Sequence, residues 1–287
     1  MDVSTGSKIR TYQGTLQEQN KGGIDYNADD YWQSNIARYS RLKNELLLTK
    51  NDKNFITEKT GINAIQWNIS TGAPNKLYEG HTKAVISMDQ SEDGSILATA
   101  DGAGEIFLWN TKTGGLIKRI KPHRESIFDV SLSRDGKSVA TAAWDATIQV
   151  FDVESGLSNS SMDLGNNSCY SISFTPNGLY LLCGRLDKSF ELREPDSKKV
   201  VLTFIGHTDV VSSIAFGVNP YNALTASWEG SARIWDVTTG MMIQKFKGAR
   251  GMLQTAIYNV DGKKLLLAAT TASFGFGVLQ QDKCLKH

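Results

Sequence analysis

A period of 42 residues runs through most of the chain and constrains its fold more than any other feature of the sequence. Residues 141–156 read TAAWDATIQVFDVESG, and residues 225–240, two periods later, read TASWEGSARIWDVTTG. Turn-forming dipeptides recur at the same interval: Asn51-Asp52, Asp93-Gly94, Asp135-Gly136, Asn177-Gly178, Asn219-Pro220 and Asp261-Gly262. Asn, Asp and Gly favour tight turns because they tolerate left-handed backbone or bond to it locally. The sequence therefore predicts a fold built from equivalent units.

Each unit has the pattern of short strands separated by turns. In the third unit, residues 126–133 (SIFDVSLS) and 147–151 (TIQVF) alternate apolar and polar side chains, and residues 137–143 (KSVATAA) follow the Asp-Gly turn. Short alternating segments at this spacing indicate an all-β array. We find no long amphipathic helix in this region, so the expected fold class is all-β.

The ends of the repeats resemble those of the WD40 family. Three repeats open on a dipeptide containing His and close on an aromatic dipeptide: Gly80-His81 to Trp109-Asn110, Pro122-His123 to Phe151-Asp152, and Gly206-His207 to Trp235-Asp236. The first, fourth and last units are degenerate. WD40 repeats each form one four-stranded blade of a β-propeller. The resemblance covers roughly residues 39–279 and implies that residues 1–287 form a single propeller domain.

Six blades are recognisable, and the ends of the chain suggest how the ring would close. Residues 2–14 (DVSTGSKIRTYQG) resemble the end of a repeat, such as residues 236–248 (DVTTGMMIQKFKG). In the WD40 family an N-terminal strand usually completes the last blade, which leaves no open sheet edge. We therefore expect residues 7–13 to supply the outer strand of the blade formed by residues 252–279. A seventh blade is the alternative if part of an earlier repeat is missing.

About 24 residues interrupt the period near residues 15–38, which are polar and include Trp32. Two interpretations remain open for this insertion. It is either a solvated surface loop or a partner-binding segment containing Trp32, because long loops in compact domains are often functional.

The resemblance also assigns a structural role to the histidines. In WD40 blades a buried hydrogen-bond chain joins a His on the loop between blades, a Thr or Ser, an acid and the Trp. The matching residues are His81, Thr99 and Trp109; His123, Thr141 and Asp145; and His207, Thr225, Glu229 and Trp235. The third repeat has Phe151 at the Trp position, and the second has Ala103 at the acid position, with Asp101 as the candidate substitute. Because equivalent slots lie far apart around a ring, we expect no metal site or catalytic triad from these histidines.

Two other tryptophans are candidates for partner binding. Trp144 and Trp228 each precede the acid turn, where the family places the rim beside the central channel. They are either anchors for a partner, since Trp is enriched at interface hot spots, or packing residues against the neighbouring blade. Arg185 and Asp209 are further rim candidates.

Composition excludes several classes of function. The net charge of +1 gives no footprint for nucleic acid or an anionic membrane. Three cysteines without a CxxC motif suggest a reducing compartment. The sequence also shows no signal peptide and no membrane-spanning run. We therefore expect an intracellular protein, cytoplasmic or nuclear, that is monomeric by itself.

The function expected from these features is a non-catalytic scaffold that binds other proteins of a complex through its rim. We find no nucleophile–base pair, phosphate-binding loop or metal-ligand cluster, so we expect no cofactor and no enzymatic activity. One alternative is an RNA-associated subunit of a ribonucleoprotein, translation or ribosome-assembly complex, although the near-neutral charge disfavours direct nucleic-acid binding. A remote alternative is a propeller enzyme using Asp89 and Asp129 of the innermost strands.

Overall fold

The computed structural model describes residues 46–49, 53–59, 62–217, 219–247, 251–258, 265–269 and 275–277. These residues form strands β1 to β23, arranged in six antiparallel sheets. Five sheets have four strands and the last has three within the described part of the chain. We call them blades 1 to 6.

The blades follow one another along the chain. Blades 1 to 3 contain β1 (Leu46–Leu48), β2 (Asn54–Lys59), β3 (Asn63–Asn68) and β4 (Pro74–Tyr78); β5 (Val85–Gln90), β6 (Ile96–Asp101), β7 (Ile106–Asn110) and β8 (Leu116–Ile120); and β9 (Ile127–Leu132), β10 (Ser138–Ala143), β11 (Thr147–Asp152) and β12 (Ser158–Asp163). Blades 4 to 6 contain β13 (Cys169–Phe174), β14 (Leu181–Arg185), β15 (Phe190–Arg193) and β16 (Val200–Phe204); β17 (Val211–Phe216), β18 (Asn222–Ser227), β19 (Ser231–Asp236) and β20 (Met242–Lys247); and β21 (Leu253–Tyr258), β22 (Leu265–Ala269) and β23 (Gly275–Gly277).

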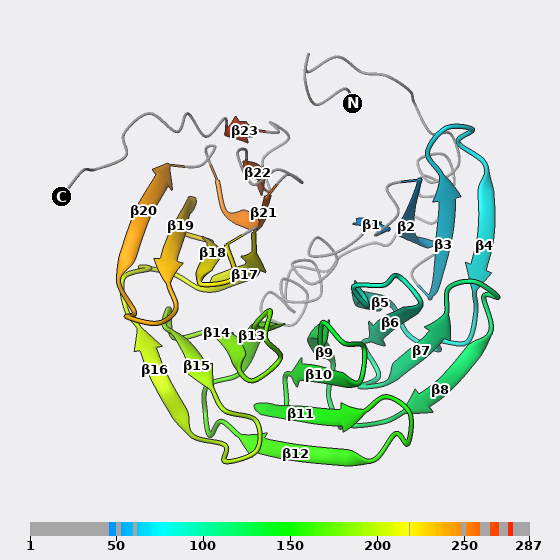
Figure 1. Ribbon diagram of the computed structural model, residues 1–287, viewed down its shortest axis with the longest axis horizontal. Helices are drawn as coiled ribbons and strands as arrows, with labels where there is room; N and C mark the ends of the chain where they lie inside the picture. The colour runs from blue at the N-terminus through cyan, green and yellow to red at the C-terminus, as the bar shows by residue number, and fades with distance from the viewer. Residues whose placement is uncertain are drawn as a thin grey trace, which may run out of the picture.

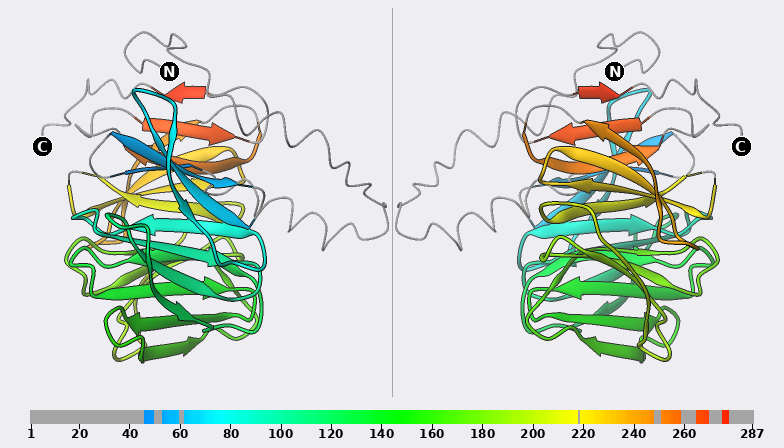
Figure 2. Two further views of the ribbon diagram at one scale, coloured as in Figure 1. Left: turned by 90° about the vertical axis from the view of Figure 1, so that its right-hand side faces the viewer. Right: turned by 90° about the vertical axis from the view of Figure 1, so that its left-hand side faces the viewer.

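The sheets are arranged around a common axis. In blades 2 to 5 the first strand is innermost and the fourth outermost, as Figure 1 shows. Figure 2, at right angles to this view, shows the strands crossing the thickness of the ring. The predicted all-β propeller is confirmed. The predicted closing strand at residues 7–13 and the insertion at residues 15–38, with Trp32, lie outside the described residues.

In blades 2 to 5 the predicted turn dipeptides join the first strand to the second, whereas Asn51-Asp52 and Asp261-Gly262 lie outside the described residues. Gly94, Gly136 and Gly178 have φ angles of 71°, 70° and 73°, in the left-handed region that glycine adopts most easily. The preceding Asp or Asn side chain caps the turn: Asp93 Oδ1 accepts from the backbone N–H of Ser95 at 3.0 Å. In these blades the 42-residue period therefore corresponds to one tight turn per blade.

The hydrophobic core lies between neighbouring blades. Ile106 and Leu108 of β7 pack with Ile127 and Val130 of β9 in one buried cluster. Because each strand alternates its side chains between two faces, a blade contributes to the layers on both sides. This packing fixes the positions of the loops at each end of the strands.

Hydrogen bonds from side chain to backbone also join the innermost strands. Asp89 Oδ2 accepts from the N–H of Leu132 at 2.7 Å, and Asp129 Oδ2 accepts from the N–H of Ile172 at 2.9 Å. Asp129 Oδ1 also accepts from Ser87 Oγ at 2.8 Å. The two carboxylates thus connect blades 2, 3 and 4, and their place in the fold has a structural explanation.

Candidate functional site

Blade 5 contains the complete hydrogen-bond chain that the resemblance predicted. His207 Nδ1 lies 2.9 Å from Glu229 Oε1, His207 Nε2 lies 2.7 Å from Thr225 Oγ1, and the indole N–H of Trp235 donates to the same hydroxyl at 2.9 Å. A carboxylate can only accept, so Nδ1 carries the proton and Nε2 accepts from Thr225. Thr225 is fully buried and Trp235 nearly so. The chain therefore connects the rim loop to the core of the blade.

Blade 3 has the same chain without its last member. His123 Nδ1 lies 3.0 Å from Asp145 Oδ2, and His123 Nε2 lies 2.7 Å from Thr141 Oγ1. Phe151 is buried at the Trp position and has no N–H to donate. Thr141 therefore has one polar side-chain partner where Thr225 has two.

Blade 2 completes its chain with the substitute acid. His81 Nδ1 lies 2.8 Å from Asp101 Oδ2, while His81 Nε2 and Trp109 Nε1 lie 2.6 and 2.8 Å from Thr99 Oγ1. Asp101 Oδ1 also accepts from the backbone N–H of Ala103 at 2.9 Å. The carboxylate thus reaches His81 from the end of β6 instead of from the turn.

Burial keeps the histidines of blades 3 and 5 neutral. Burial lowers the pKa of His207 to about 4, outweighing its hydrogen bond to Glu229, and it lowers the pKa of His123 despite Asp145. Burial alone would raise the pKa of Glu229, but hydrogen bonds from Ser231, Thr208 and His207 outweigh it and lower that pKa. At neutral pH each pair is a neutral imidazole donating to a carboxylate, which suits a structural role.

Blade 4 replaces this chain with an ion-pair cluster. Arg185 donates from Nη1 to both carboxylate oxygens of Glu191 at 3.1 and 3.0 Å, and Arg193 donates from Nε to Glu191 Oε2 at 2.8 Å. Arg185 is 8% exposed, although it was a candidate rim contact. The structure places it inside the blade, where its guanidinium is occupied by Glu191. Sequence periodicity missed this cluster because Glu191 has no counterpart in the repeat pattern.

Trp144 and Trp228 are the ends of a row of four aromatic rings. Trp144 meets Phe128 edge to face at 5.2 Å between ring centroids, Phe128 meets Tyr170 at 5.0 Å, and Tyr170 meets Trp228 edge to face at 5.3 Å. This rim aromatic row crosses blades 3, 4 and 5. Such ring pairs stabilise by about 0.5–1.5 kcal/mol beyond the area that they bury. Trp228 of blade 5 therefore packs on Tyr170 of blade 4, whereas Trp144 packs on Phe128 of its own blade.

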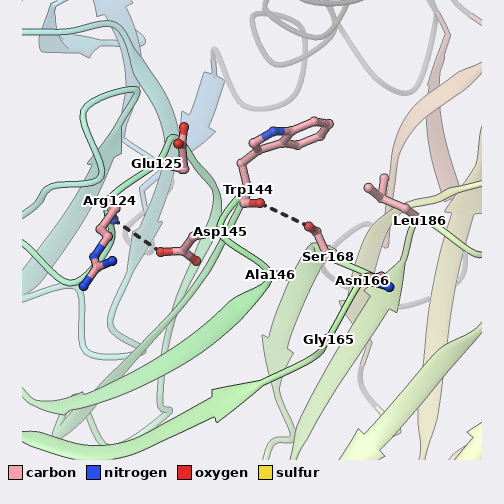
Figure 3. Close-up of a pocket in the computed structure, with 9 residues that line it drawn as sticks. All are labelled: Arg124, Glu125, Trp144, Asp145, Ala146, Gly165, Asn166, Ser168 and Leu186. Carbon is pink, nitrogen blue, oxygen red and sulfur yellow. Dashed lines mark hydrogen bonds between the residues drawn. The ribbon is translucent and has the colours of Figure 1, made fainter.

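Trp144 nevertheless remains 41% exposed. It lines a hollow of about 530 Å³ between blades 3 and 4, shown in Figure 3. The other lining residues are Arg124, Glu125, Asp145, Ala146, Gly165, Asn166, Ser168 and Leu186. Ser168 Oγ donates to the backbone oxygen of Trp144 at 3.4 Å, which links the two blades beneath the indole. The arrangement offers an apolar face bordered by polar side chains.

Asp209, the remaining rim candidate, stabilises its own loop. Its carboxylate accepts from the N–H of Val210 at 2.8 Å, and its backbone oxygen accepts from Ser227 Oγ at 3.0 Å. Val210 belongs to the same buried cluster as Phe128 and Tyr170. Asp209 thus lies beside the aromatic row, and its contact with a partner remains a prediction.

The described residues contain neither a candidate metal site nor a candidate membrane-spanning helix. No group of three or more His, Cys, Asp or Glu side chains in the described ranges could hold a metal ion. Among the residues that the structure describes, no helix has the length and apolar character needed to cross a membrane.

Comparison with known proteins identifies the repeats. The model of the family described as "WD domain, G-beta repeat" matches residues 72–110, 114–152 and 198–236. These matches cover parts of blades 1 to 5 and omit the degenerate fourth unit between them.

Three relatives match one part of the chain each. Ribosome biogenesis protein YTM1 of Yarrowia lipolytica is 32% identical over 104 residues, which is 34% of this chain and 20% of that protein. Nuclear distribution protein nudF 1 of Talaromyces marneffei is 33% identical over 90 residues, 31% of this chain and 19% of that protein. Periodic tryptophan protein 2 homolog of Dictyostelium discoideum is 33% identical over 104 residues, 35% of this chain and 11% of that protein. The matched segments thus span at most a fifth of these relatives.

The repeat period, the blade topology, the two complete hydrogen-bond chains and the match to the family model agree with one another. Three segments of the chain are therefore WD40 repeats, and they lie within a β-propeller fold.

Proposed function

We propose that this chain is a non-catalytic scaffold that holds other proteins of an intracellular complex, cytoplasmic or nuclear, through the rim of blades 3 to 5. The observation that carries the proposal is the exposed indole of Trp144 at the end of a rigid aromatic row. A large ring held in place loses little entropy on binding, and Trp is enriched at interface hot spots.

The surroundings of Trp144 support a protein partner. Leu186 extends the apolar surface across the hollow, while Arg124, Glu125 and Asn166 surround it with groups that can form hydrogen bonds. An apolar centre with a polar border is the usual anatomy of a protein–protein interface.

The buried polar groups give no support to a catalytic role. Asp89 and Asp129 accept backbone N–H groups of neighbouring strands, and the described histidines are bonded within their blades. Each of these groups thus stabilises the ring, and none is left to form an active site in the proposed scaffold.

A second candidate is a subunit of a ribosome-assembly complex. One relative carries ribosome biogenesis in its name, but another is named for nuclear distribution. Relatives named for different processes are expected if what they share with this chain is a scaffold fold that serves different complexes. Salt-sensitive binding of the purified chain to RNA would favour direct RNA contact; proteins retained after RNase treatment would favour a scaffold joined by protein contacts.

The proposal is tested by affinity purification from the source cells with Trp144→Ala beside wild type. Trp144→Ala is preferable to Trp228→Ala because Trp228 is the more buried of the two. Leu179→Ala is a matched control, since Leu179 is 62% exposed in the turn between β13 and β14, at the opposite end of the strands.

We expect a protein partner to be lost from the Trp144 variant and kept by the Leu179 variant, with equal circular dichroism spectra. An identical set of partners for all three chains would refute binding through the rim.

A further inference from the structure

The outer side of blades 4 and 5 carries an apolar surface unconnected with the rim aromatic row. Met242 and Ile243 of β20 are 47% and 54% exposed, Met241 just before β20 is 71% exposed, and Val200 at the start of β16 is 43% exposed. We call these four residues the side patch. Gly240, before Met241, packs against Leu202 of β16: a Cβ there would lie 3.2 Å from the leucine side chain. The two outer strands are therefore neighbours, as they are in Figure 1.

The fold itself does not require apolar residues at these positions. In blade 1 the corresponding strand β4 begins with Pro74 and Asn75, and in blade 3 the strand β12 begins with Ser158 and Asn159. All four of these residues are exposed as well. Blades with polar outer strands form in the same ring, so packing within the blade does not require the side patch. Because β8 of blade 2 also begins with two exposed apolar residues, Leu116 and Ile117, it is the charge of β20 that distinguishes this strand.

Strand β20 is the outermost strand of its sheet among the described residues, and it is the most exposed of the outer strands. A terminal strand presents unpaired backbone groups to which another extended segment can add. Lys245 and Lys247 lie two positions apart in the regular part of β20 and share one face. Ile243 precedes them at a bulge, where the register shifts between Ile234 and Trp235 of β19. β20 thus offers one exposed apolar side chain beside two cationic ones and contains no acid.

The lysines of β20 form fewer hydrogen bonds and ion pairs with described residues than the cationic side chains of β8, the outer strand of blade 2. On β8, Lys118 donates to the backbone oxygen of Glu154 at 2.6 Å, and Arg119 donates to both oxygens of Glu105 at 2.9 Å. On β20, Lys245 comes no closer than 4.0 Å to Glu229, and no described residue forms an ion pair with Lys247. The cations of β20 are thus available to a partner.

We propose that β20 binds an extended segment of another protein, which adds as a fifth strand to blade 5. The segment places two carboxylates opposite Lys245 and Lys247 and an apolar side chain opposite Ile243. Cross-strand pairs of opposite charge stabilise a sheet, and like charges directly opposite destabilise it. The lysines therefore select an acidic segment and disfavour pairing of β20 with a second copy of itself.

The test uses the full chain and a fluorescent peptide, Thr-Glu-Thr-Glu-Thr-Ile-Thr, which runs antiparallel to β20 in the proposed register. Fluorescence anisotropy measures binding at low salt. The variant Lys245→Glu/Lys247→Glu turns two attractive pairs into two repulsive ones, so binding weakens roughly tenfold or more. The same variant gains affinity for the peptide in which Lys replaces each Glu. Lys118→Glu/Lys121→Glu in blade 2 is the matched control and binds as wild type does.

Hydrogen exchange locates the site. We expect the acidic peptide to protect the backbone amides of β20, and Trp144→Ala to leave this protection unchanged because the rim is a separate surface. No saturable binding, equal binding by the β20 and blade 2 variants, or protection confined to other strands would each overturn the proposal.

Discussion

The hydrogen-bond chains of blades 3 and 5 allow a comparison within one molecule. Thr225→Val keeps the shape of a fully buried side chain but removes the hydroxyl that meets both Trp235 Nε1 and His207 Nε2. Two buried groups then lose their partner, at about 1–3 kcal/mol each. We expect Thr225→Val to lower the free energy of unfolding by about 2–6 kcal/mol.

Thr141→Val is the matched control. Its hydroxyl meets only one polar side chain, His123 Nε2, because Phe151 has no N–H. The weaker contact of each hydroxyl with a backbone oxygen is 3.4 Å in both blades and does not distinguish them. Thr141→Val should therefore cost only about 1–3 kcal/mol, and the difference between the two variants measures the indole hydrogen bond.

Urea unfolding followed by circular dichroism gives both values from the shift in midpoint at constant slope. The reasoning fails if the two variants are destabilised equally, or if Thr141→Val is the more damaging change. Either result would mean that the indole contributes nothing to the chain in blade 5.

Three further predictions concern charge, backbone and the inner strands. The pKa of His207 falls from 6.5 in the unfolded chain to about 4 in the fold. Below pH 6.5 the unfolded chain therefore takes up a proton that the folded chain does not, and the fold loses stability as the pH falls. Urea unfolding should show that the free energy of unfolding drops by about 2 kcal/mol between pH 7 and pH 5, and that His207→Gln lacks this drop. Gly104→Ala should cost at least about 3 kcal/mol, because Gly104 has a φ of 80° and a Cβ would lie 2.4 Å from a backbone oxygen; Gly178→Ala, with a φ of 73° and open space, should cost about 1–2 kcal/mol in the same urea assay. Asp129→Ala removes an acceptor shared by blades 2 and 4 and should lower stability by about 2 kcal/mol in that assay.

The sequence could predict whatever repeats within a single blade. The 42-residue spacing located the turns and the strands. The resemblance then located the chain of His207, Thr225, Glu229 and Trp235, because its members occupy fixed slots of one unit. Blade 2 was harder to predict, since Asp101 reaches His81 from a position that no other described blade uses for this purpose.

Contacts between blades could not be predicted in the same way. The rim aromatic row joins Phe128 of blade 3, Tyr170 of blade 4 and Trp228 of blade 5, and nothing in a repeat pattern indicates which side chains of neighbouring units meet. Arg185 shows a limit within one blade, because its position suggested a surface residue but its ion pair with Glu191 lies inside blade 4. The direction of a side chain depends on the strand packed beside it, and the sequence alone does not show which side chains of that strand it meets.

The bonds between the innermost strands restrict how the length of this protein can change. The link from Asp89 to Leu132 and the link from Asp129 to Ile172 each join residues 43 positions apart, and both depend on the alternation of each strand between its two faces. One residue added inside β9 would turn half of that strand over and separate its acceptors from the neighbouring donors. Residues added to an exposed turn, or a whole repeat added at once, would leave every such pair in register. Homologous chains should therefore differ in length in their loops and in their number of blades, while the inner strands keep the same length.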